Sequence, residues 1–188
     1  MDGDYLDGKG TDVTGYDATA RPDRSPLTVL LLLLVVAAVQ LSHYYPLLPG
    51  VIATHFDVSG RVDGWSEKLT FIITYGSIEV VVVAVGLLLA RFATRIPAGA
   101  LNIPNRDYWL APERRAETLQ FVWTQVLWME VATLAFLILV AEVLFRANLA
   151  SEVPTLSHDF FIILGVFIAV VAWMSVRIVR RFRVSGSS

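Results

Sequence analysis

The sequence predicts an all-α integral membrane protein with four transmembrane helices and a small extracytoplasmic hairpin-like loop. Of its 188 residues, 55% are hydrophobic and only 17% are charged, whereas about 25% of residues are charged in an average soluble domain. The mean hydropathy is +0.61, and the apolar residues fall into long blocks separated by polar breaks. This pattern argues against a soluble enzyme, and a net charge of −2 gives no support for nucleic-acid binding.

Each apolar block is long enough to cross a bilayer, because about 20 helical residues at about 1.5 Å per residue span the hydrocarbon. The predicted spans are residues 27–45, 70–90, 119–145 and 160–176. The first is expected to begin with Ser25 as N-cap and Pro26 as the first helical residue, and to end at Tyr45 and Pro46. The third is longer than a span requires, so we expect it to tilt or to project from the bilayer.

The two ends of the chain differ from this membrane domain, which covers residues 26–184. Residues 1–25 are predicted to form a disordered acidic tail, because aspartates alternate with glycines and leave little to bury. Residues 185–188 are predicted to be a flexible C-terminus. The long acidic tail lacks the basic start of a cleaved signal peptide, so we expect the first span to remain as an anchor.

The distribution of Lys and Arg predicts the orientation. Twelve of the fifteen lie in the N-terminal tail, in the loop between the second and third spans and in the C-terminus. The other two loops hold only Arg61, Lys68 and Arg146. By the positive-inside rule, both termini are expected to be cytoplasmic, in a bacterial or archaeal plasma membrane.

The loop between the first two spans is predicted to form a β-hairpin. Two β-prone runs, 51–58 and 61–65, flank a two-residue turn at Ser59-Gly60. Strand alternation would place the side chain of His55 on one face of the first strand and that of Phe56 on the other.

The same loop carries an ordered string of motif residues. They are Leu48, Pro49, Ile52, His55, Phe56, Gly60, Asp63, Gly64 and Lys68. The string resembles the signature of a bacterial membrane family of largely unknown function, with a pattern like LPxxIPxHFxxxGxxDGxxxK, which includes the SdpI-type toxin-immunity proteins. The second proline of that pattern is Ala53 here. The resemblance covers the first two spans and their joining loop.

Some members of that family protect their producer from a secreted toxic peptide and relay its presence to a cytoplasmic repressor, although SdpI-type proteins are typically longer and have more spans. The resemblance therefore implies immunity to, or sensing of, an extracytoplasmic peptide or envelope signal. The ligand or signal contacts that it implies are His55, Phe56, Asp57, Asp63 and Trp65.

The inner loop, residues 101–115, looks like a stretch of shorter relatives of the same family. Its aromatic residues suit headgroup depth while its arginines face lipid phosphates, so membrane anchoring competes with docking of a cytoplasmic regulator. The predicted cytoplasmic interface is Asn102, Asn105, Trp109, Arg114 and Arg115.

All three histidines are expected at the outer face, where carboxylates also lie. His55, with His158 or Asp159 from the fourth helix, supplies ligand types suited to a metal ion. The spacing matches no metal motif, and a histidine that fastens the hairpin to the helix ends by hydrogen bonding is the favoured interpretation. Metal binding stays open, and no cofactor is expected.

Glu79 and Glu130 lie near the middle of the second and third spans, where a charge costs about 3 kcal/mol on insertion scales. If these spans are neighbours, we expect the carboxyls at similar depth, with one protonated or a cation between them. Tyr75 and Thr133 share the same helix faces and complete a predicted polar seam. A proton or cation relay and a simple interhelical hydrogen bond are both open.

These observations leave three functional classes. The first is an SdpI-like immunity or sensing protein, the second a small proton- or cation-coupled transporter subunit that uses the paired glutamates, and the third a structural membrane protein. An enzyme is not expected, since no nucleophile elbow, GxGxxG or Walker A pattern occurs. The expected partners are the lipid bilayer, an extracytoplasmic peptide, a cytoplasmic regulator and further copies of the chain.

Overall fold

The computed structural model describes residues 23–92, 103–150 and 153–183. Within these ranges four helices are long and apolar enough to cross a membrane, which indicates a multi-pass membrane protein. They are α1 (Ser25–Tyr44), α2 (Lys68–Phe92), α4 (Pro112–Ala150) and α5 (His158–Arg181). The predicted flexible C-terminus, and all but the last three residues of the predicted acidic tail, lie outside the described residues.

The helices begin earlier or end later than several predicted spans. Ser25 is the first residue of α1 and not its N-cap. The carboxylate of Asp23 accepts a hydrogen bond from the Ser25 N–H at 2.9 Å, and this bond lowers the pKa of the Asp23 carboxyl. The 39 residues of α4 correspond to about 58 Å of helix. The hydrocarbon layer is about 30 Å thick, so this helix is longer than a span along the membrane normal requires.

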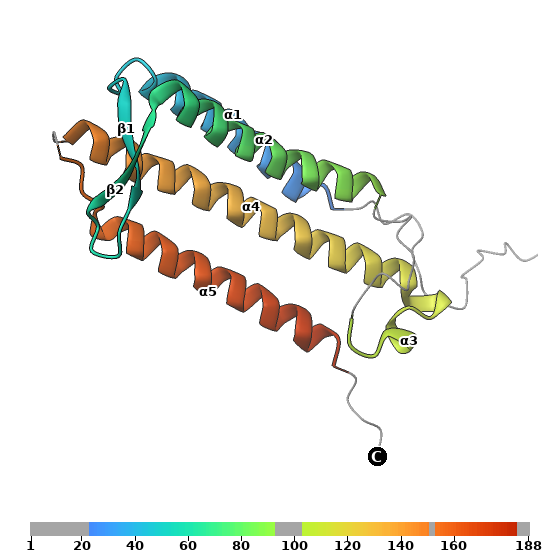
Figure 1. Cartoon of the computed structure of the whole chain (residues 1–188). Coiled ribbons are helices and arrows are strands. Elements are labelled where there is room, and N and C mark those ends of the chain that lie inside the picture. The colour runs from blue at the N-terminus through green and yellow to red at the C-terminus, as the bar shows by residue number, and fades with distance from the viewer. Residues whose placement is uncertain (1–22, 93–102, 151–152, 184–188) are drawn as a thin grey trace, which may run out of the picture.

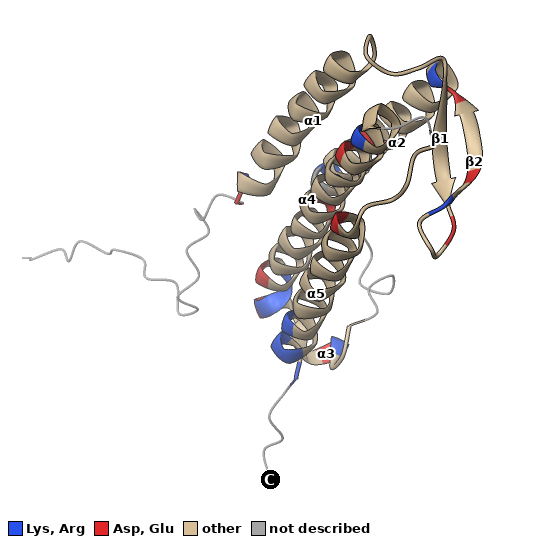
Figure 2. Ribbon diagram, turned by 90° about the vertical axis from the view of Figure 1, so that its left-hand side faces the viewer, with Lys and Arg blue, Asp and Glu red and all other residues tan. Residues whose placement is uncertain are grey.

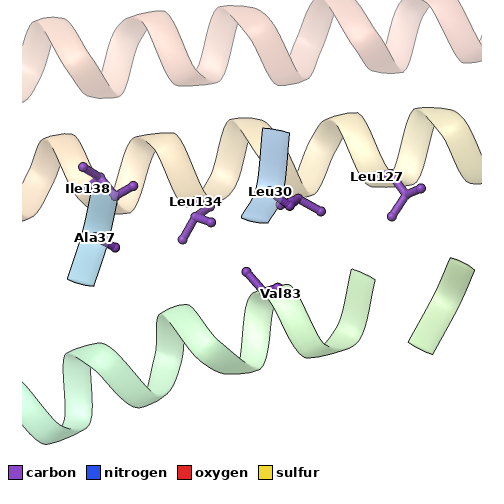
Figure 3. Packing of buried hydrophobic residues seen from close by; sticks show 6 residues of the cluster. All are labelled: Leu30, Ala37, Val83, Leu127, Leu134 and Ile138. Atoms are coloured by element: carbon purple, nitrogen blue, oxygen red, sulfur yellow. The ribbon is translucent and has the colours of Figure 1, made fainter. Parts of the chain in front are cut away.

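Helix α4 is the centre of the bundle (Figure 1). It packs against α1, α2 and α5, whereas α4 is the only one of the other three long helices that α5 packs against among the described residues. One apolar cluster joins α1, α2 and α4 (Figure 3). Its buried members are Leu30, Ala37, Val83, Leu127, Leu134 and Ile138. The outward faces of all four helices remain apolar and exposed, as expected for helices surrounded by lipid.

Strands β1 (Val51–Phe56) and β2 (Val62–Glu67) form an antiparallel two-stranded sheet across one end of the bundle (Figure 1). We call this the hairpin end. The sheet rests on a second apolar cluster, which the strand residue Ile52 shares with Tyr75 of α2 and Phe145 of α4. The hairpin therefore packs on the helices instead of standing free.

The connection between the strands differs from the predicted two-residue turn. The Asp57 N–H donates to the Arg61 carbonyl at 2.8 Å, which leaves three residues inside the loop. Gly60 has a φ of +79°, a left-handed conformation that glycine adopts at little cost. Burial along β1 does not alternate strictly, because Ile52 and Ala53 are both buried and irregular pairing flanks His55. The predicted opposition of His55 and Phe56 is nevertheless present, since His55 is exposed while Phe56 packs against the apolar cluster.

The opposite end of the bundle carries most of the described arginines, and we call it the arginine end. It includes the short helix α3 (Arg106–Trp109) and the C-terminal end of α5. In Figure 2 the blue segments that mark Lys and Arg are concentrated at this end, whereas the hairpin carries both blue and red segments.

Asn148, near the C-terminal end of α4, joins that helix to the hairpin. Its Oδ1 accepts a hydrogen bond from the Ala53 N–H at 2.8 Å, and its Nδ2 donates to the Ala53 carbonyl at 3.0 Å. Nδ2 also donates to the Leu144 carbonyl at 2.9 Å. The buried amide thus satisfies both backbone groups of a strand residue, as a neighbouring strand would.

We predict that Asn148→Leu lowers the free energy of unfolding by about 3 kcal/mol, because it leaves a buried N–H and a buried carbonyl of Ala53 without partners. Denaturant unfolding in detergent micelles measures the change. Leu149→Ala, at the next and exposed position, is the control and should change stability by about 0.5 kcal/mol or less. Equal stability of Asn148→Leu and the wild type would contradict the assigned role of the amide.

Candidate functional site

An open cavity of about 580 Å³ lies between the hairpin and the end of α4. Its lining consists of Leu47, Pro49, Val51, Trp65, Asn148, Leu149, Ala150 and Pro154. Trp65 is 54% exposed, and Leu47, Val51 and Leu149 are exposed as well. Because large apolar side chains gather around a hollow, this surface suits an apolar or amphipathic ligand. We call it the outer hollow.

Lys68, the last residue of the motif, closes the end of α1. Its Nζ donates to the carbonyls of Tyr45 at 3.1 Å and Leu48 at 2.9 Å. The same nitrogen lies 4.8 Å from the centroid of the Tyr45 ring. Carbonyls at a helix end have no partner within the helix, so an ammonium group stabilises them well. The motif lysine is therefore a structural cap.

His55 binds within the hairpin and not to the helix ends, contrary to the favoured interpretation from the sequence. Its Nδ1 lies 2.5 Å from Oδ1 of Asp63, and the two side chains are 76% and 47% exposed. A Cβ atom at Gly64 would lie 2.7 Å from the Cβ of His55. Asp63 thus provides a hydrogen-bond partner for the imidazole. The missing side chain of Gly64 allows the two strands to lie close together at His55.

Asp57 organises the turn. Its Oδ1 accepts hydrogen bonds from the Ser59 hydroxyl at 2.5 Å, the Ser59 N–H at 2.8 Å and the Arg61 N–H at 3.0 Å. The Arg61 guanidinium binds Oδ2 at 3.2 Å. These donors, the Ser59 hydroxyl first, lower the pKa of the Asp57 carboxyl from 3.8 to about 2.

The five contacts implied by the family resemblance therefore separate into two groups. Asp57 is engaged inside the turn, and Phe56 packs against the apolar cluster under the sheet. His55, Asp63 and Trp65 are exposed. Only the exposed group is available to a ligand in this arrangement.

The candidate metal ligands do not converge in the part of the chain that the structure describes. No three side chains of His, Cys, Asp and Glu gather there as a metal site requires. His158 begins α5, and Asp159 accepts a hydrogen bond from the Ser157 hydroxyl at 3.3 Å.

Glu79 and Glu130 occupy different levels of the α2–α4 contact. The Tyr75 hydroxyl donates to the Leu137 carbonyl, whereas Glu130 lies so close to Gly86 that a Cβ there would be 2.0 Å from its Oε2. Gly86 is seven residues, or about 10 Å of helix, beyond Glu79. The carboxyls are therefore offset along the bundle and do not face each other at one depth.

Each of these glutamates has a buried oxygen without a hydrogen-bond partner: Oε1 of Glu79 and Oε2 of Glu130. Glu79 is only 2% exposed. Thr133 does not extend a seam between helices, because its hydroxyl donates to the Met129 carbonyl of its own helix at 2.9 Å. The expected seam thus consists of a Tyr75–Glu79 pair and a separate Glu130 rather than a continuous chain of hydrogen bonds.

A second polar cluster, which sequence reasoning missed, lies between α1 and α4. Glu142 accepts hydrogen bonds from Gln40 at 3.0 Å, Tyr44 at 2.7 Å and Arg146 at 2.6 Å. Only the Glu142–Arg146 spacing carries a sequence signal, because residues four apart on a helix are neighbours. Unlike Glu79, this acid has its partners in place.

At the arginine end, inner-loop residues bind the end of α5. Nδ2 of Asn105 and Nε1 of Trp109 donate to the Phe182 carbonyl at 2.9 and 3.2 Å. Arg181 pairs with Glu117 and lies 4.8 Å from the Trp109 ring centroid. Two residues of the predicted cytoplasmic interface thus serve as an internal cap.

The other predicted interface residues have different positions. The guanidinium of Arg114 lies 4.2 Å from the Tyr108 ring centroid. Arg115 lies in the first turns of α4. Asn102 lies outside the described residues.

Comparison with known proteins finds a domain of unknown function, DUF1648, at residues 29–76. The match covers most of α1, the whole hairpin and the beginning of α2. It agrees with an uncharacterised membrane family, and its description gives no activity. No curated protein and no solved structure matches the chain.

We predict that the turn keeps its structure in mild acid and loses it only near pH 2. Because the pKa of Asp57 is lowered from 3.8 to about 2, the stabilisation is complete above pH 3.8 and is lost as the pH falls through 2. The amide NMR shifts of Ser59 and Arg61 in detergent micelles report this change.

In the Asp57→Asn variant those amide signals should be displaced already at neutral pH and should lack the acid transition. A wild-type transition centred near the ordinary value of 3.8 would contradict the turn geometry.

Proposed function

We propose that this protein is an SdpI-like membrane protein that senses, or gives immunity to, an extracytoplasmic peptide or envelope signal. The observation that carries the proposal is the outer hollow, in which Trp65 and Val51 of the hairpin and Leu149 of α4 leave apolar surface exposed beside a cavity. Aromatic side chains at such a surface typically dominate peptide binding. The DUF1648 match includes the whole hairpin.

The charge distribution supports an external position for the hairpin end. Lys and Arg are concentrated at the arginine end, whereas the described part of the hairpin end carries Arg61, Lys68 and Arg146. The positive-inside rule places the richer end in the cytoplasm. A peptide outside the cell would then meet the outer hollow directly.

Helix α4 supports a route for the signal. The hairpin is held to α4 by Asn148 and to the α4–α5 connection by a 2.9 Å hydrogen bond from the Leu156 N–H to the Gly60 carbonyl. The same helix begins beside the internal cap at the arginine end, where its residue Glu117 pairs with Arg181. A ligand that displaces the hairpin would therefore act on an element that reaches both ends.

We predict that Trp65→Ala lowers the tolerated concentration of toxic peptide by at least about tenfold. An aromatic side chain that becomes buried under a bound peptide contributes about 2 kcal/mol to the binding free energy. His55→Ala should abolish protection if the exposed face of the hairpin contacts the ligand. Retention of membrane potential is measured in expressing cells challenged with membrane-active peptides from closely related strains.

Val58→Ala is the matched control, because Val58 is an apolar hairpin residue that is 98% exposed and does not line the outer hollow. It should protect as well as the wild type at equal expression. Full protection by Trp65→Ala would contradict the proposal.

A second candidate is a small proton- or cation-coupled transporter subunit. It is favoured by the unpartnered buried oxygens of Glu79 and Glu130, because residues 70–90 and 119–145 contain no Lys or Arg to neutralise them. Four helices enclose little space, so this function would require an oligomer.

For this candidate we predict that Glu79→Gln and Glu130→Gln each abolish cation-dependent proton flux in proteoliposomes, because neither amide can carry a proton in exchange. A pH-sensitive dye inside the vesicles measures the flux. Glu67→Gln, at an exposed position of β2, should keep wild-type flux. Unchanged flux in both buried-acid variants would exclude this mechanism.

A further inference from the structure

A lateral groove lies between α1 and α2 and holds a cavity of about 610 Å³. Its walls include Leu34, Ala38 and Leu41 of α1 and Gly76, Ser77 and Glu79 of α2. The groove is open because Ala38, Gly76 and Ser77 are small. A Cβ atom at Gly76 would lie 3.3 Å from Cδ1 of Leu41 and would begin to fill it. The volume is within the range of about 300–1,000 Å³ that small-molecule sites occupy.

The groove opens on the outer surface of two apolar helices. Ala38, Ser77 and Val80 are exposed along it, and no Lys or Arg contributes to its lining. In a multi-pass membrane protein this surface faces lipid, so a ligand would enter from the bilayer.

Glu79 is the one ionisable residue that lines this groove. It is 98% buried, and its Oε1 has no hydrogen-bond partner. The nearby Tyr75 hydroxyl lies between the Leu137 carbonyl and the Glu79 carboxylate, and its single proton can serve at most one of these acceptors at a time. A buried acid with an unpartnered oxygen is stabilised most by a cation or by a proton.

The surroundings select the kind of cation. A small metal ion needs several oxygen ligands to replace its water, whereas this groove offers one carboxylate among apolar side chains. An organic cation carries less tightly bound water and fills apolar volume with its own hydrocarbon groups. We infer that the α1–α2 groove binds a lipophilic organic cation from the bilayer, with Glu79 as its counter-charge.

This site does not depend on the outer hollow. Glu79 lies about three turns along α2 from the hairpin, and no hairpin residue lines the groove. Trp65→Ala should therefore leave cation binding unchanged, and loss of peptide protection would say nothing against the groove.

Equilibrium binding of tetraphenylphosphonium to the full chain in phosphatidylcholine nanodiscs tests the inference. The wild type should bind the probe saturably. Glu79→Gln should weaken binding at least tenfold, because the counter-charge is lost. Ala38→Phe should weaken it similarly by filling the groove, and Glu79→Asp should retain more binding than Glu79→Gln because it keeps the charge.

Two variants serve as controls. Ala84→Phe adds the same bulk at an exposed position of α2 outside the groove, and Glu67→Gln removes a carboxylate from the hairpin. Both should bind tetraphenylphosphonium as the wild type does. The unfolding midpoint of each variant must equal that of the wild type, and its elution volume is recorded beside the binding curve.

Absence of saturable wild-type binding, or wild-type affinity in Glu79→Gln, would overturn the inference. An Ala38→Phe variant that binds the probe normally but separates into smaller particles would also overturn it, because the groove would then be a contact between copies of the chain. If only the two Glu79 variants and Ala38→Phe lose affinity as described, the site is the α1–α2 groove.

Discussion

The position of the hairpin depends on one amide side chain. A two-stranded sheet is marginally stable by itself, and here Asn148 pairs with the N–H and the carbonyl of Ala53 from the last turns of α4. Ile52 anchors the neighbouring strand position in the apolar cluster, and Gly60 binds the α4–α5 connection. The outer hollow exists because these contacts hold the sheet beside the end of α4 while leaving the Trp65 side chain exposed.

Polar groups in the spans fall into two classes that differ in whether their hydrogen bonds are complete. Glu142, near the hairpin end, has donors from α1 and from its own helix, so its role in holding α1 to α4 accounts for its presence. Glu79 and Glu130 lie deeper and each retains an unpartnered oxygen. Since an unsatisfied buried acid destabilises the fold, these two residues are where a proton or a ligand has most to contribute.

At the arginine end, several residues of the predicted cytoplasmic interface make contacts within the protein. Asn105 and Trp109 use their donors on the Phe182 carbonyl, and so they fix the end of α5 against the start of α4. Arg181 takes part in the same contact through Glu117 and the Trp109 ring. Any regulator that approaches this end would therefore meet a preformed structure, linked by α4 to the hairpin.

The sequence by itself determined the four long apolar helices, because the thickness of the hydrocarbon layer sets a length that a local run of apolar residues must meet. It also located the β-prone runs and the motif residues His55, Asp63 and Gly64, whose contacts join positions at most nine residues apart. Only the tertiary structure decided that Asn148 holds the hairpin and that Gln40 and Tyr44 satisfy Glu142, since these partners are 95 to 102 residues apart. It also decided that Glu79 faces a lateral groove while Glu130 meets Gly86, because the relative level of two side chains depends on helix register, and register is set by packing between helices and not by any local pattern.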